Sequence, residues 1–117
     1  MIAVDTDDTA QLWVTWADAA RHQARALGTQ GNLFDCSLKN ARAETYARAV
    51  AVLRANPDHE QAAKVMMKNA AEVHVRVAPL IGFDQAAVRY TVARTWQRCA
   101  LMLDSSLDEV QPLWAER

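Results

Sequence analysis

The chain has 117 residues, 51% of them hydrophobic, and its 13 Lys and Arg side chains nearly balance its 14 Asp and Glu side chains. This length fits one domain with a single core, and a near-neutral chain has no bulk attraction for nucleic acid or anionic membrane. About one residue in five is alanine, the strongest helix former, whereas Gly and Pro number 3 each, so the composition favours helices over sheets.

The segment 8–27 carries the clearest structural pattern in the chain. Apolar residues recur on one helical face at spacings of three and four, namely Trp13, Trp16, Ala17, Ala20, Ala24 and Leu27. Polar residues occupy the opposite face, so the pattern predicts an amphipathic helix whose apolar stripe is covered by other helices. Asp8 followed by Gln11 is a start signal, and Gly28 is expected to end the helix.

A second helix is predicted over 37–56, with Asp35 or Ser37 as its N-cap. Its core face contains Leu38, Ala41, Thr45, Ala49, Val52 and Leu53, with Tyr46 at the edge of that face. Pro57 breaks this helix. Because proline and acidic residues both suit the first turn of a helix, a third helix is predicted over 58–78.

The end of the third helix is open, because the alternation of Val73, Val75 and Val77 with polar residues also suits a short strand. A fourth helix is predicted over 85–103 and a short fifth helix over 106–114. The fourth has a wide apolar arc of Val88, Val92, Thr95, Trp96, Cys99, Ala100, Met102 and Leu103, which is typical of a central helix. The predicted fold class is therefore all-α: an up-down four-helix bundle with a short C-terminal fifth helix, in a single domain.

Motifs for catalysis and for cofactor or metal binding are missing from the sequence. The three histidines form no HExxH or Cys/His pair at ligand spacing, and the esterase, P-loop and dinucleotide motifs are absent. No catalytic residue, metal or cofactor is therefore assigned. The two cysteines, Cys36 and Cys99, are too few for a disulfide framework, which favours a reduced, cytoplasmic setting. No apolar run is long enough to predict a membrane span.

Four polar residues fall on or beside predicted core faces. They are Arg42 on the second helix, Asn69 and Arg76 on the third and Arg89 on the fourth. In an up-down bundle the three arginines share one level, near the N-termini of two helices, where the positive potential is greatest. Structural pairing with carboxylates such as Asp35 and Asp84 is the favoured interpretation. The alternative is a pocket for an anionic ligand or for a partner's carboxylate.

Three of the four tryptophans, Trp13, Trp16 and Trp114, are predicted near the same end of the bundle. A Trp-rich core is the favoured interpretation, and an aromatic patch that binds a partner or a second copy of the chain is the alternative. Small helical accessory proteins of bacteria commonly have this character. We therefore expect a soluble regulatory or interaction protein that acts by binding a protein partner, with a homodimer as one form of that contact.

Two other functions are weighed against this one. The first is an anionic small-molecule binder or enzyme that uses the arginine-lined end of the bundle, which requires a concave pocket of about 300 Å³ or more. The second is nucleic-acid binding, with Arg94 and Arg98 on the outer face of the fourth helix as its best footprint. The near-neutral charge disfavours nucleic acid.

Overall fold

The computed structural model describes residues 5–77 and 83–107, and for 74–77 and 83–84 it describes the backbone alone. This part of the chain forms four helices, α1 (Thr6–Thr29), α2 (Leu33–Ala55), α3 (His59–Val77) and α4 (Phe83–Leu103), and contains no strand. The predicted all-α class is thus confirmed. The run from Val73 to Val77, which the sequence left open, is helical.

The predicted fifth helix over 106–114 falls mainly outside the described residues. Where the structure does describe its start, Ser105 and Ser106 form a turn after α4. The Asp104 carboxylate accepts hydrogen bonds from the Ser106 backbone N–H and hydroxyl, at 3.0 and 2.6 Å. These bonds stabilise the carboxylate and lower the pKa of Asp104.

The first helix begins and ends slightly beyond its predicted limits. The side chain of Asp5, rather than that of Asp8, caps α1 by accepting the backbone N–H groups of Asp7 and Asp8, both at 3.0 Å. Gly28 does not end the helix, which continues to Thr29. The reversal is made by Gly31, whose φ of 80° lies in the left-handed region that glycine adopts without strain.

The second helix begins four residues earlier than predicted because its N-cap is Asn32 rather than Asp35 or Ser37. The Asn32 side chain accepts the Asp35 backbone N–H at 3.2 Å and donates to the Asp35 carboxylate at 2.8 Å. Ser37 already lies inside the helix, where its hydroxyl donates to the Leu33 carbonyl oxygen. The connection between α1 and α2 is consequently only three residues long.

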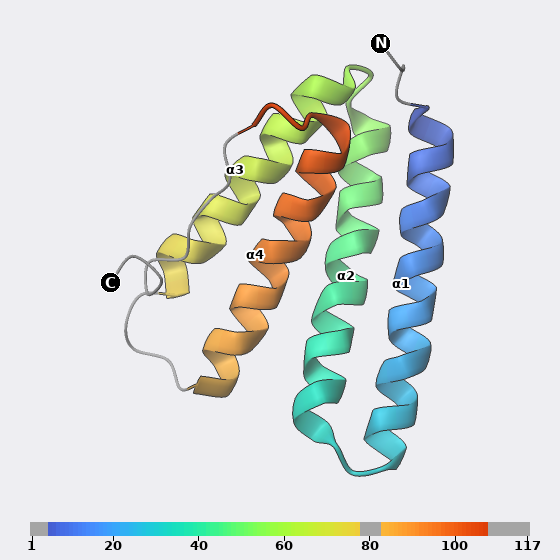
Figure 1. Cartoon of the computed structure of the whole chain (residues 1–117), viewed down its shortest axis with the longest axis vertical. Helices are drawn as coiled ribbons and strands as arrows, with labels where there is room; N and C mark the ends of the chain where they lie inside the picture. Colours follow the sequence, from blue (N-terminus) through green and yellow to red (C-terminus); the bar gives the residue numbers. More distant parts are fainter. Residues whose placement is uncertain (1–4, 78–82, 108–117) are drawn as a thin grey trace.

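The four helices reverse direction one after another, as an up-down arrangement requires (Figure 1). They form two hairpins, because α1 packs mainly on α2 and α3 packs mainly on α4. The hairpins join along α2 and α4, which run parallel and lie between α1 and α3 in Figure 1. This parallel junction positions the candidate site described below.

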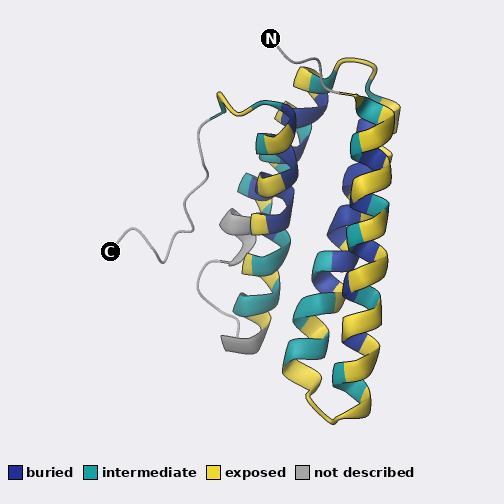
Figure 2. Cartoon of the chain, turned by 45° about the vertical axis from the view of Figure 1, so that its right-hand side comes forward, coloured by how far each residue is buried: buried dark blue, intermediate teal, exposed yellow. Residues whose placement is uncertain are grey.

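Buried residues line the inward faces of the helices, and the outer faces are exposed (Figure 2). Small residues dominate α1 and allow it to approach α2 closely, whereas the largest buried side chains are Trp13, Tyr46, Leu53, Met66, Trp96 and Leu103. Tyr46, predicted at the edge of the core face, is only 3% exposed. Trp16, predicted in the core stripe, is half-buried and packs against the core from its edge.

Candidate functional site

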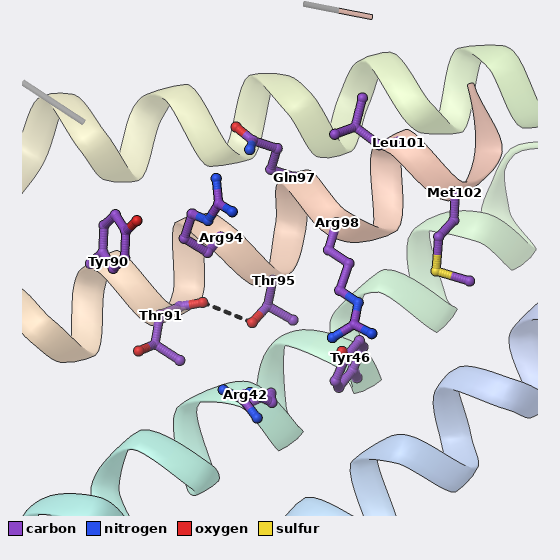
Figure 3. A pocket seen from close by; sticks show the side chains of 10 residues that line it. All are labelled: Arg42, Tyr46, Tyr90, Thr91, Arg94, Thr95, Gln97, Arg98, Leu101 and Met102. Atoms are coloured by element: carbon purple, nitrogen blue, oxygen red, sulfur yellow. Dashed lines mark hydrogen bonds between the residues drawn. The ribbon is translucent and has the colours of Figure 1, made fainter. Parts of the chain in front are cut away.

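A hollow of about 670 Å³ lies on one face of the α2–α4 junction, and we call it the arginine hollow. Two of its ten lining residues come from α2 and eight from α4: Arg42, Tyr46, Tyr90, Thr91, Arg94, Thr95, Gln97, Arg98, Leu101 and Met102 (Figure 3). Three of them are arginines and none is acidic. A group of positive charges is thus gathered at one place on a chain whose net charge is −1.

Four of the eight α4 residues that line the hollow form one polar stripe along the helix. Thr91, Arg94, Thr95 and Arg98 follow each other at spacings of three, one and three residues, which places all four on the same side of an α-helix. The two threonine hydroxyls donate to carbonyl oxygens of their own helix, Thr91 to Ala87 at 2.9 Å and Thr95 to Thr91 at 2.7 Å. The protons of these two hydroxyls are therefore engaged, and the arginines supply the positively charged donors of the lining.

The three arginines have no carboxylate to neutralise them among the described residues. The only ion pair in this part of the chain joins Arg21 to Asp18 on α1, at 3.3 Å. The favoured sequence interpretation paired the core arginines with Asp35 and Asp84. The Asp35 carboxylate accepts a hydrogen bond from the Asn32 side chain, and the side chains of Asp84 and Arg76 lie outside the described part. Like charges that share a site repel one another, so the hollow favours an anionic occupant.

Arg98 is held against two aromatic rings rather than against an acid. Its guanidinium carbon lies 5.0 Å from the centroid of the Trp16 ring, within the range of a cation–π contact. In Figure 3 its side chain extends from α4 toward Tyr46 on α2. Burial raises the pKa of the Tyr46 hydroxyl, and the nearby positive charge of Arg98 opposes the rise. Tyr46 therefore stays neutral at physiological pH.

Apolar side chains border the arginines at the mouth of the hollow. Tyr90 is 36% exposed and Met102 is 39% exposed, which makes both of them unusually accessible for their size, and Leu101 is half-buried beside them. Arg94 and Arg98 are also exposed. The hollow is consequently a broad, open surface with cationic and apolar parts, unlike the enclosed apolar pockets that surround most small ligands.

The structure separates the residues that the sequence predicted to lie together. Arg42 lines the arginine hollow, but Arg89 is exposed and lines a second hollow of about 790 Å³ on another face of α2 and α4. The residues of this second hollow are Leu33, Phe34, Ser37, Ala41, Glu44, Arg48, Val73, Gln85, Val88, Arg89, Val92 and Trp96. Asn69 is half-buried and lines neither hollow, and the Arg76 side chain is outside the described part.

Arg94 and Arg98 were missed as partners of Arg42 because the projection of α4 assigned them to an outer face. Both assignments are confirmed, because Thr95 is buried whereas Arg94 and Arg98 are exposed. The signal that could have found the pair is their spacing of four residues, which places two arginines on one side of the helix. Finding the site also required knowing that Arg42 on α2 lines the same hollow as these residues of α4.

The predicted aromatic patch is also divided. Trp13 is 0% exposed, so it belongs to the core and cannot contact a partner in this fold. Trp16 is half-buried at the edge of the core, under Arg98. Trp114 lies outside the described residues. Of the predicted patch, the structure therefore shows one accessible ring, and that ring belongs to the surroundings of the arginine hollow.

The remaining reactive side chains of the described part are its cysteines and histidines. Cys36 is half-buried and Cys99 is buried, and both are free thiols. Within this part no group of three His, Cys, Asp or Glu side chains is gathered as a metal site would require. None of its helices is long and apolar enough to cross a lipid bilayer.

Comparisons of the chain with protein-family models, with curated proteins and with solved structures found no match. The function is therefore inferred from the residues and their geometry alone.

Proposed function

We propose that this protein binds an acidic, partly apolar segment of a partner protein in the arginine hollow. The observation that carries the proposal is the lining: three arginines, no acidic residue, and apolar side chains at the mouth. Guanidinium groups bind carboxylates through paired N–H donors, and such charge-assisted hydrogen bonds are stronger than neutral ones. The exposed Tyr90 and Met102 would contact apolar side chains between the acidic ones.

The experiment uses a short synthetic peptide of alternating Asp and Leu, labelled with a fluorophore, and the same peptide with Asn in place of Asp. We expect the full-length protein to bind the first peptide more tightly than the second, with an affinity that falls as the salt concentration rises. Arg42→Gln and Arg98→Gln each remove one positive charge from the hollow. Each is expected to weaken binding by about tenfold or more.

The matched control is Arg25→Gln, which removes the same charge from an exposed position on α1 that lines neither hollow. It is expected to leave the affinity within about twofold, because a distant exposed charge is screened by salt. Equal losses for Arg25→Gln and Arg98→Gln would show a diffuse charge effect and would contradict a site in the hollow.

A small anionic molecule is the second candidate, and the volume of the hollow favours it. A hollow of about 670 Å³ lies within the usual range for small-ligand sites. Citrate and inorganic phosphate are the probes. Tight binding of either one, together with no binding of the Asp–Leu peptide, would replace the acidic segment by a small anion as the ligand. The absence of binding by all three probes would contradict both candidates.

Self-association remains a separate proposal, and the second hollow is the surface that would carry it. Leu33 is 70% exposed and Phe34 is 36% exposed at its mouth, and exposed large apolar side chains favour contact with another protein surface. Sedimentation velocity is expected to show a dimer for the wild type at micromolar concentration and a monomer for Leu33→Ser. A wild-type monomer would contradict this proposal.

The cytoplasmic location likewise stays a prediction.

A further inference from the structure

Arg98 connects three helices at the edge of the arginine hollow. It lies on α4, its guanidinium carbon is 5.0 Å from the centroid of the Trp16 ring on α1, and its side chain extends toward Tyr46 on α2 (Figure 3). The Trp16 and Tyr46 rings contact each other as well, with centroids 5.5 Å apart. The two rings thus form a surface on which one exposed cation rests.

This surface matters because a free arginine on a helix samples many rotamers. A side chain that must be ordered when a ligand arrives loses conformational entropy at that moment, whereas a side chain that is already held does not. A cation–π contact is an attraction between the charge and the ring and uses no hydrogen-bond acceptor. The N–H donors of the guanidinium group therefore stay available to a carboxylate.

We propose that Trp16 is a positioning residue for Arg98, so that α1 takes part in binding although it contributes no residue to the lining of the hollow. The inference deepens the proposed function and rests on it. Arg94 provides an internal comparison, because it lies one turn before Arg98 in the same lining and extends away from α2 in Figure 3. A substitution of Trp16 should therefore change the affinity only when Arg98 is present, whether or not Arg94 is present.

The experiment is a pair of double-mutant cycles, with the Asp–Leu peptide and citrate as probes. Trp16→Leu removes the aromatic face and keeps an apolar side chain. We expect it to weaken binding about two- to five-fold in the wild-type and Arg94→Gln backgrounds, as a cation–π contact near the surface would. In the Arg98→Gln background it should have no further effect.

Two further variants test whether the loss is specific. Trp16→Phe retains an aromatic face and is expected to recover most of the affinity that Trp16→Leu loses. Leu12→Ala alters an exposed apolar residue of the same helix, outside the lining, and should leave the affinity unchanged. Equal losses for Trp16→Leu with and without Arg98 would overturn the positioning role.

A measurement without ligand separates this inference from the proposed function. The ring current of Trp16 should shift the side-chain Nε–H resonance of Arg98 in the NMR spectrum of the free protein, and Trp16→Leu should abolish that shift. If the shift is present and the wild type binds neither probe, the proposed function fails while Trp16 still holds Arg98. A different outcome is that the probes bind, but the shift is absent and the double-mutant cycle is additive. In that case only the inference about Trp16 fails.

Discussion

The rings of Trp16 and Tyr46 pack against each other at a tilt of 60°, with their centroids 5.5 Å apart, and this contact joins α1 to α2 beside the arginine hollow. Tilted aromatic pairs are favourable because the positive edge of one ring meets the negative face of the other. Tyr46 is buried by this contact, so the ring has a structural role while its hydroxyl is directed to Arg98.

Two substitutions at Tyr46 separate these roles. Tyr46→Ala removes a buried ring and is expected to lower the free energy of unfolding by about 3–5 kcal/mol. Tyr46→Phe keeps the ring and removes only the hydroxyl, so we expect a smaller loss of about 1 kcal/mol or less. Urea denaturation of both variants measures the difference. Equal losses for the two variants would show that the ring contact contributes little.

Trp96→Ala tests the core at the α2–α4 junction. Trp96 is 5% exposed and belongs to the central cluster, so its truncation is expected to cost about 3–5 kcal/mol and to lower the melting temperature markedly. Leu12→Ala is the control, because Leu12 is 39% exposed and its loss should cost less than about 0.5 kcal/mol. An unchanged melting temperature for Trp96→Ala would contradict this description of the core.

Asn32 is expected to determine where α2 begins. Asn32→Ala removes the side chain that accepts the Asp35 backbone N–H, and loss of such a cap costs about 0.5–2 kcal/mol. Ser37→Ala changes an exposed hydroxyl inside the helix and should alter stability by less than about 0.5 kcal/mol. Thermal melts compare the two. A larger loss of stability for Ser37→Ala than for Asn32→Ala would indicate that Ser37, one of the two predicted N-caps, caps α2.

Cys99 is expected to make the protein sensitive to alkaline pH. Burial raises the pKa of its thiol from 9.0 to about 12, so between these values the unfolded chain loses a proton that the folded chain retains. The stability contributed by the buried thiol is complete below pH 9 and falls as pH rises, by about 1.4 kcal/mol for each pH unit. The difference in unfolding free energy between wild type and Cys99→Ala should change with this slope between pH 9 and 12.

Thiol labelling tests the same burial at neutral pH. We expect Cys36, which is half-buried, to react with a thiol reagent in the folded protein, whereas Cys99 reacts only after unfolding. Cys36→Ser should therefore abolish labelling of the native state. Rapid labelling of native Cys36→Ser would mean that Cys99 is accessible.

The helical class and most of the buried faces could be predicted from the sequence, because both follow from local periodicity. Trp13, Ala17 and Ala20 recur at helical spacing and are buried, and Trp96 and Leu103 do the same on α4. Helix ends were less predictable. Several residues near each end can act as a cap, and the turn geometry at Gly31 selects Asn32 for α2.

Which arginines share a site depends on how the helices pack against one another. A helical projection shows that Arg94 and Arg98 lie on one side of α4, but it contains no information about which neighbour faces that side. The parallel packing of α2 against α4 places Arg42 beside them and turns Arg89 toward a different hollow. The contact between Trp16 on α1 and Arg98 on α4 likewise depends on the geometry with which the helices cross. The spacing of residues within either helix contains no information about it.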